Sequence, residues 1–129
     1  MSKLVAFTIA IACLSAPSLA LAQEGDAAAG KTVFNKCMAC HNVDTDKAKV
    51  GPSLKGVIGR QPGSVEGYKY STAMVEFGQG KTWDEALLTT YLPDPKGLVK
   101  GTKMSFPGLK KPEDVANVIA YIKTFSAAN

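Results

Sequence analysis

The sequence predicts an all-α fold in which four or five short helices and long loops wrap around one group that is not protein. No segment shows the sustained polar–apolar alternation of a β-strand, whereas several short stretches have helix caps and helical spacing. The stretch 42–67 instead holds five glycines and two prolines, which are typical of a loop. Loops this long are uncommon in a small domain unless they serve a site, so we expect a non-protein group to complete the core.

Length and composition restrict the remaining possibilities. The chain has 129 residues, 46% of them hydrophobic and 20% charged, and a formal net charge of +4. These values are ordinary for one globular domain, and they exclude intrinsic disorder and fibrous repeats. Three cysteines and one histidine also exclude a framework of several disulfides and a zinc site built on several histidines.

The first 22 residues are predicted to be a signal peptide. Lys3 precedes an uncharged apolar run over 4–14, and Ala20-Leu21-Ala22 has the small-x-small pattern of a cleavage site. A retained membrane anchor is the alternative, although the run is short for a membrane span. Cleavage after Ala22 would remove Cys13, leave one domain over 23–129 and place the protein in the periplasm.

Two short helices in the first part of this domain are predicted from their N-caps. Asp26 precedes strong helix formers and caps a helix that runs to about Lys36. Ser71 caps a second helix that ends at Phe77. Both caps would accept hydrogen bonds from the free N–H groups of the first helical turn.

Two further helices follow, separated by a loop over 95–107. Thr82 and Glu85 have the spacing of a capping box, which predicts a helix that ends before Pro93. Pro112 begins the last helix, where proline is favoured in the first turn. Apolar residues at spacings of three and four then give that helix one buried face: Val115, Val118, Ile119, Ile122 and Phe125.

The segment Cys37-Met38-Ala39-Cys40-His41 indicates what the loops surround. In an exported chain, Cys-x-x-Cys-His is the attachment signal for c-type haem. Two thiols on one turn can form thioethers with the porphyrin, and the adjacent histidine can ligate the iron. A structural disulfide, a thioredoxin-like redox pair and a zinc site are the alternatives. The first would close a very small loop, the second needs a βαβ setting, and the third needs more ligands than the domain offers.

The second axial ligand is predicted to be a methionine, because the domain has no second histidine. Met104 lies in a loop with glycines and a proline, far enough along the chain from His41 to reach the iron. Met38 is too close to that histidine, and Met74 falls in a short helix where it would fill apolar space. A histidine–methionine pair raises the reduction potential and leaves no open position, which favours electron transfer over catalysis.

Further short motifs stand in a fixed order around the Cys-x-x-Cys-His segment. They are Gly30 and Phe34, Val50-Gly51-Pro52-Ser53-Leu54-Lys55-Gly56, Gly59-Arg60, Gly67-Tyr68-Lys69-Tyr70-Ser71, Thr82-Trp83, Tyr91-Leu92, Pro95-Lys96, Gly101-Thr102-Lys103-Met104 and Ala120-Tyr121. This ordered set resembles class I c-type cytochromes, and it is most similar to the group of bacterial cytochrome c2 and mitochondrial cytochrome c. The resemblance extends over nearly all of 23–129 and implies the small cytochrome c fold, with one covalent haem.

The resemblance also implies roles for residues close to the two axial ligands. The carbonyl of Pro52 would accept a hydrogen bond from the ring of His41 and so fix its tautomer. Tyr91 and Thr102 would lie near the sulfur of Met104. The thioethers to haem c would form at Cys37 and Cys40.

Three more residues are implied to bind the haem propionates. Tyr70 and Trp83 would donate hydrogen bonds to them, and Arg60 would offset their negative charge. For Trp83 alone, an aromatic side chain that simply fills the core is the alternative.

The resemblance also implies how two helices pack, and the sequence differs from the mitochondrial proteins of the family at two places. Gly30 would let the first and last helices cross closely, with Phe34 and Tyr121 packed at the crossing. Met74 stands where the mitochondrial proteins have an asparagine, so a polar network of that group is in doubt here. The stretch 75–81 is also longer, so no contact in it can be transferred.

The predicted function is one-electron transfer by a small basic protein that is not an enzyme. The resemblance implies a quinol–cytochrome c oxidoreductase as donor and a photosynthetic reaction centre or terminal oxidase as acceptor, and we expect a monomer. Nucleic acid is another possible partner for a basic protein, but export and the haem motif argue against it. A haem peroxidase or small-ligand sensor with a labile methionine is the alternative. Partners would dock through lysines at the exposed haem edge: Lys36, Lys49, Lys55, Lys100, Lys103, Lys110 and Lys111.

Overall fold

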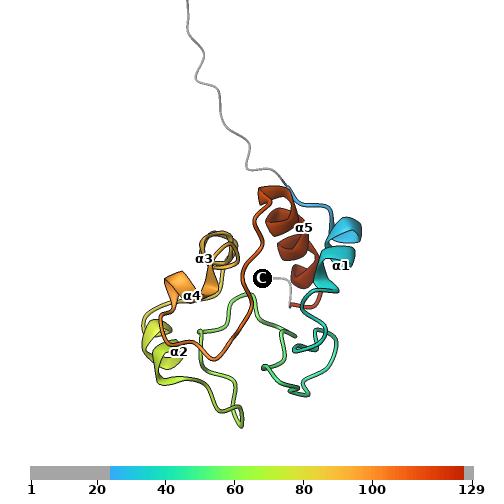
Figure 1. The fold of residues 1–129 in the computed structure, drawn as a ribbon. Coiled ribbons are helices and arrows are strands. Elements are labelled where there is room, and N and C mark those ends of the chain that lie inside the picture. Colours follow the sequence, from blue (N-terminus) through green and yellow to red (C-terminus); the bar gives the residue numbers. More distant parts are fainter. Residues whose placement is uncertain (1–23, 127–129) are drawn as a thin grey trace, which may run out of the picture.

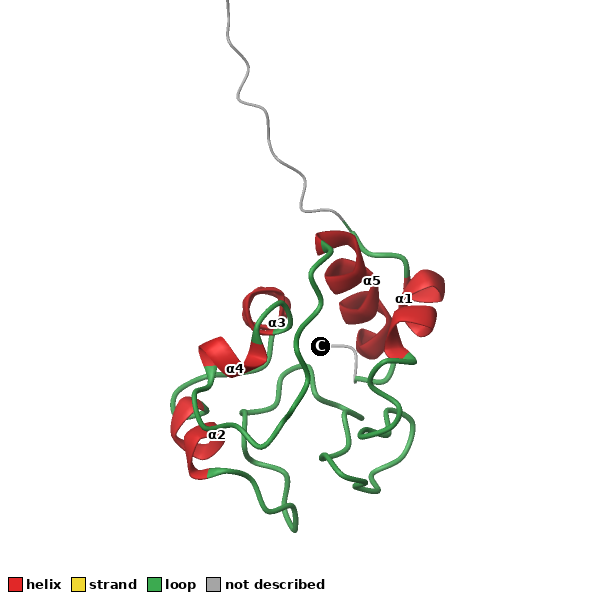
Figure 2. Cartoon of the chain, in the orientation of Figure 1, coloured by secondary structure: helices red, strands yellow, loops and turns green. Residues whose placement is uncertain are grey.

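The structure is a computed structural model that describes residues 24–126, so the predicted signal peptide and its cleavage site lie outside the described residues. The described part contains no strand, which confirms the all-α prediction (Figure 2). None of its helices is both long and apolar enough to cross a membrane. Long loops join five helices: α1 (Ala27–Phe34), α2 (Thr72–Phe77), α3 (Glu85–Tyr91), α4 (Pro95–Leu98) and α5 (Pro112–Lys123).

Helices α1 and α5 cross each other on one side of the molecule (Figure 1). A Cβ atom at Gly30 would collide with the Asn117 carbonyl and lie 2.8 Å from the Tyr121 Cβ. The rings of Phe34 and Tyr121 pack with their centroids 5.4 Å apart. The Asn117 side chain also accepts a hydrogen bond from the Asp26 backbone N–H at 2.8 Å. The close crossing that the resemblance implied is therefore present.

Gly30→Ala is expected to lower the free energy of unfolding by roughly 2–4 kcal/mol, because the new methyl group forces the two helices apart. The matched control is Ala28→Val, which adds bulk at an exposed position of the same helix and should cost only about 0.5 kcal/mol. Guanidinium denaturation followed by circular dichroism measures both. Equal losses in the two variants would contradict the close crossing.

The apolar face of α5 forms the centre of the core. Phe125 lies just past the end of the helix and is half-buried against the same core. Helix α3 contributes Leu88, and an ion pair between Glu85 and Lys123 joins the first turn of α3 to the last turn of α5. The other four predicted positions are all buried, as their spacing indicated: Val115, Val118, Ile119 and Ile122.

Helices α2 and α4 lie on the other side of the molecule, away from α1 and α5 (Figure 1), and loops hold them in place. A Cβ atom at Gly78 would collide with the Pro62 carbonyl, so the end of α2 rests on the loop before it. Gly101 adopts a φ of +94° and brings the loop after α4 against α2, where an added Cβ would lie 3.3 Å from that of Ala73. This half of the molecule is therefore organised mainly by loop contacts.

The start of α3 differs from the prediction. The helix begins at Glu85 with Asp84 as its N-cap, whose carboxylate accepts a hydrogen bond from a first-turn N–H at 2.7 Å. The capping box from Thr82 is therefore wrong. The backbone N–H of Trp83 donates to the Arg60 carbonyl at 2.8 Å, which holds residues 82 and 83 in a loop.

The predicted loop over 95–107 is also wrong for its first four residues, which form α4. Asp94 caps this single turn by accepting a hydrogen bond from the Gly97 N–H at 3.0 Å, and the buried Pro95 begins it. A proline and a glycine within four residues suggested a loop, although an Asp-Pro pair is also a favourable helix start. The stretches 99–107 and 42–67 have no helix, as predicted.

Candidate haem site

The turn that follows α1 carries both thiols of the Cys-x-x-Cys-His segment. The Cys37 N–H donates to the Phe34 carbonyl at 2.8 Å, so the chain continues from the helix directly into the turn. The N–H groups of Cys40 and His41 both donate to the Cys37 carbonyl, at 3.0 and 2.9 Å. Both thiols are half-buried and free. One turn thus presents two thiols and a histidine side by side.

The thiol chemistry at this turn does not favour a redox pair. Burial raises the pKa of Cys37 to about 11, while the positive charge of Lys36 opposes the shift. A thiol with a raised pKa stays protonated at neutral pH and is a poor nucleophile. A desolvated thiol of this kind does not favour a thioredoxin-like redox pair.

The His41 ring is held by the loop that follows it. Its Nδ1 donates a hydrogen bond to the Pro52 carbonyl at 2.7 Å, the contact that the resemblance implied. A carbonyl can only accept, so Nδ1 carries the proton and Nε2 keeps its lone pair. Burial lowers the pKa of His41, with the Pro52 hydrogen bond opposing, and the imidazole is therefore neutral at pH 7. A Cβ at Gly51 would collide with the ring, so glycine is needed beside it.

Met104 lies half-buried in the loop between α4 and α5. Its backbone N–H donates to the Thr102 hydroxyl at 3.2 Å, and its sulfur accepts a hydrogen bond from the Tyr91 hydroxyl at 3.3 Å. Burial raises the pKa of Tyr91 to about 12, so this hydroxyl stays protonated and can donate. The structure brings both predicted neighbours to Met104, whose sulfur still has a lone pair for a metal.

The loop that holds His41 is joined to α3 through Arg60. The Arg60 guanidinium donates to the Ser53 carbonyl at 2.8 Å, and the Arg60 carbonyl accepts from the Trp83 N–H. The Trp83 indole packs on the Tyr91 ring with their centroids 4.8 Å apart. A continuous series of contacts therefore connects the loop around the histidine with the tyrosine that binds the methionine sulfur.

Of the residues implied for the propionates, Arg60 and Trp83 belong to this series of contacts. The Tyr70 hydroxyl accepts a hydrogen bond from the Val65 N–H at 3.3 Å and keeps its hydrogen for another acceptor. Trp83 is buried. Burial lowers the pKa of Arg60, and an anion beside the guanidinium would offset that cost.

The sequence model of the family described as Cytochrome c matches residues 27–126. The chain belongs to the cytochrome c family. It therefore binds haem c covalently and serves in electron transfer. The residues described above fit that group, because two free thiols stand next to a neutral imidazole with an available Nε2, and a thioether sulfur is held in place by a tyrosine.

Several bacterial cytochromes are similar to this one. Cytochrome c2 iso-2 of Magnetospirillum fulvum is 54% identical over 91 residues, which are 70% of this chain and 93% of that protein. Cytochrome c2 of Blastochloris viridis is 45% identical over 113 residues, or 87% of each chain. The solved structure of cytochrome c2 from Rhodospirillum centenum has a TM-score of 0.76 at 39% identity and covers 80% of this chain and 100% of its own. The predicted small cytochrome c fold is thus confirmed.

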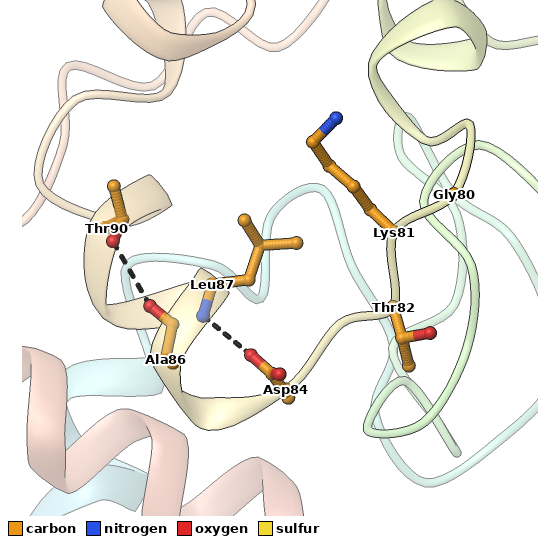
Figure 3. Close-up of a pocket in the computed structure, with 7 residues that line it drawn as sticks. All are labelled: Gly80, Lys81, Thr82, Asp84, Ala86, Leu87 and Thr90. Carbon is orange, nitrogen blue, oxygen red and sulfur yellow. Dashed lines mark hydrogen bonds between the residues drawn. The ribbon is translucent and has the colours of Figure 1, made fainter.

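A surface hollow of about 460 Å³ lies outside this haem site, between the loop 80–82 and α3 (Figure 3). Lys81 and Leu87 are among its lining residues, whereas Asp84 and Thr90 are already engaged in hydrogen bonds of the helix. None of the site residues that the sequence predicted lines it. The residues predicted to bind the haem therefore do not form this hollow.

Some contacts around the haem site of this cytochrome were not predicted. Each joins loops that are distant in sequence, so no local spacing signals it. The only hint is that both partners of two of these contacts belong to motifs of the resemblance. The contacts are hydrogen bonds from Tyr68 to the Val50 carbonyl at 2.8 Å, from Lys49 to the Met38 carbonyl at 2.8 Å, and from Lys103 to the Lys69 carbonyl at 3.0 Å.

Proposed function

We propose that this cytochrome is a periplasmic one-electron carrier whose haem is attached through Cys37 and Cys40 and ligated axially by His41 and Met104. The observation that carries the proposal is that two side chains able to ligate iron are each held by a hydrogen bond. The His41 imidazole donates to the Pro52 carbonyl, and the Met104 sulfur accepts from the Tyr91 hydroxyl. When bound, the haem supplies a reversible iron(III)/iron(II) couple. Two protein ligands leave no position for a substrate, which supports a carrier over a peroxidase or a ligand sensor.

The surrounding residues would tune and hold the group. The hydrogen bond to Pro52 increases the basicity of His41 and fixes its orientation. Tyr70, Trp83 and Arg60 would neutralise and bind the propionates, in keeping with the free hydroxyl hydrogen of the tyrosine and the partly buried guanidinium. The domain over 23–129 would be exported by a signal peptide cleaved after Ala22.

The partners of this carrier would meet it through its lysines. Lys36 and Lys55 form exposed ion pairs, at 3.7 and 3.1 Å, which offset part of their charge. Lys103 and Lys110 donate to backbone carbonyls and so keep their charge. We propose a quinol–cytochrome c oxidoreductase as the electron donor and a photosynthetic reaction centre or terminal oxidase as the electron acceptor. The cytochrome would bind these partners as a monomer and would not bind nucleic acid.

The rate of reduction by purified quinol–cytochrome c oxidoreductase tests this function. The second-order rate constant is expected to fall by roughly tenfold between about 10 and 200 mM salt, because salt screens the attraction between lysines and an acidic surface. Reduction by a neutral small-molecule quinol is the control and should change little. No reduction by the enzyme, or a rate that salt leaves unchanged, would contradict the proposal.

Tyr91→Phe is expected to lower the reduction potential by roughly 20–50 mV, the equivalent of one neutral hydrogen bond. In the wild-type protein, the hydrogen bond from the Tyr91 hydroxyl withdraws electron density from the Met104 sulfur. Without that hydrogen bond, the sulfur is a better donor to iron(III). Potentiometric titration measures the change. Tyr68→Phe is the control, because that hydroxyl binds the Val50 carbonyl and should leave the potential unchanged. Equal shifts in both variants would refute the assigned contact.

A further inference from the structure

Ser53 is a buried polar residue whose side chain the haem site described above does not use. Only 3% of the residue is exposed. Its hydroxyl donates a hydrogen bond to the Thr45 carbonyl and accepts one from the Lys55 N–H at 3.1 Å. A buried hydroxyl is costly unless it is hydrogen-bonded, and this one has a partner both as donor and as acceptor. These two bonds fix the position and the rotamer of the side chain.

The backbone around Ser53 lies alongside the segment that carries His41. The His41 Nδ1 donates to the Pro52 carbonyl at 2.7 Å, one residue before the serine. Residues 51–54 and 40–42 are therefore held together on both sides of this contact. The two backbone hydrogen bonds that flank it, both of 2.8 Å, run from the Gly51 N–H to the Cys40 carbonyl and from the Leu54 N–H to the Asn42 carbonyl.

The direction of the Pro52 carbonyl depends on how Ser53 is held. A peptide bond is planar, so this carbonyl and the Ser53 N–H form one rigid unit. The proline ring fixes φ before that unit, and Ser53 holds its other end. The Ser53 side chain is bonded to Thr45, and its own carbonyl accepts from the Arg60 guanidinium at 2.8 Å. Because both parts of the serine are bonded, the peptide unit stays turned toward the imidazole.

We propose that Ser53 is a positioning residue for the axial ligand His41. By binding the Thr45 carbonyl, its hydroxyl keeps the Pro52 carbonyl aligned with the Nδ1–H group of the imidazole. The inference rests on the proposed ligation of iron by His41. A well-aligned acceptor increases the basicity of the ring, and a more basic ligand favours iron(III). Loss of the serine hydroxyl therefore raises the reduction potential.

The test removes this hydroxyl and then restores it. Ser53→Ala deletes both side-chain hydrogen bonds, and Ser53→Thr keeps a hydroxyl at the same position. The matched control is Ser126→Ala, because the Ser126 hydroxyl accepts from the Ile58 N–H at 3.2 Å and so holds a later part of the same loop. Each variant is compared with the wild type in its reduction potential, the NMR signal of the His41 Nδ1 proton in the reduced protein, and its free energy of unfolding.

Ser53→Ala is expected to raise the equilibrium constant for reduction roughly fivefold, which corresponds to the weakening of one neutral hydrogen bond. The Nδ1 proton signal should move upfield, because its hydrogen bond is weaker. Ser53→Thr should return both values to those of the wild type. Ser126→Ala should destabilise the protein to a similar extent as Ser53→Ala, with the potential and the proton signal unchanged.

Three results would overturn the inference and leave the proposed function intact. The first is a wild-type potential and proton signal in Ser53→Ala. The second is an equal shift in Ser126→Ala, which would show that any loosening of the loop has this effect. The third is a shift in Ser53→Thr as large as that in Ser53→Ala. A wild-type protein whose His41 ring protons lack the displaced NMR signals of an iron ligand would overturn both the inference and the proposed ligation.

Discussion

Changing both Cys37 and Cys40 to alanine is expected to leave a chain that does not fold cooperatively. Helices α2 and α4 add little helix–helix packing, and long loops hold them in place. A haem that is covalently attached completes the interior against which such loops pack. Several apolar side chains remain only half-buried against the core of the protein part: Leu54, Ile58, Leu92 and Phe106.

Thermal denaturation followed by circular dichroism measures this loss. Each single variant, Cys37→Ala or Cys40→Ala, retains one thiol and should attach haem poorly rather than not at all. Cys13→Ala is the control, since that residue lies in the predicted signal peptide and should not affect attachment. A cooperative transition in the haem-free double variant would show that the protein part is sufficient for the fold.

Met104→Ala is expected to lower the reduction potential by roughly 0.2 V, a fraction of the ~0.8 V range over which axial ligands set it. The haem should remain attached through the thioethers, with His41 as its remaining protein ligand. Loss of the thioether removes the donor that favours iron(II) and opens a coordination position. Carbon monoxide should then bind the reduced variant promptly, whereas the wild-type protein should resist it.

The control is Met74→Ala, which removes a buried methionine of α2. This change should destabilise the protein by about 2–4 kcal/mol through the cavity it leaves, without altering the potential or admitting carbon monoxide. Visible spectroscopy under carbon monoxide and potentiometric titration distinguish the two variants. If Met74→Ala opened the iron and Met104→Ala did not, the assigned ligand would be wrong.

Elements governed by local interactions were predictable from the sequence. Asp26 and Ser71 cap α1 and α2 as predicted, because each side chain bonds to N–H groups two or three residues away. The start of α3 was not predictable, since Thr82 and Asp84 are both suitable caps. The choice between them depends on the hydrogen bond from the Trp83 N–H to the Arg60 carbonyl, which only the folded chain provides.

In the candidate site, too, local features were predictable from the sequence and contacts between distant loops were not. The Cys-x-x-Cys-His segment is local and could be interpreted directly, and the resemblance supplied the contacts of His41 with Pro52 and of Tyr91 with Met104. The bonds of Arg60 to the carbonyls of the loop before it had no sequence signal, because a carbonyl acceptor exists at every residue. Such contacts depend on the paths of the loops, which glycine and proline permit but do not specify.

The hydrogen bond from Asp26 to Asn117 joins residues 91 positions apart, and it bears on the order of events during synthesis. A ribosome completes α1 and the two thiols long before it makes α5. Until that last helix emerges, Phe34 has no Tyr121 to pack against, and the first helix cannot close the domain. The crossing of the first and last helices is therefore among the last tertiary contacts that the growing chain can make.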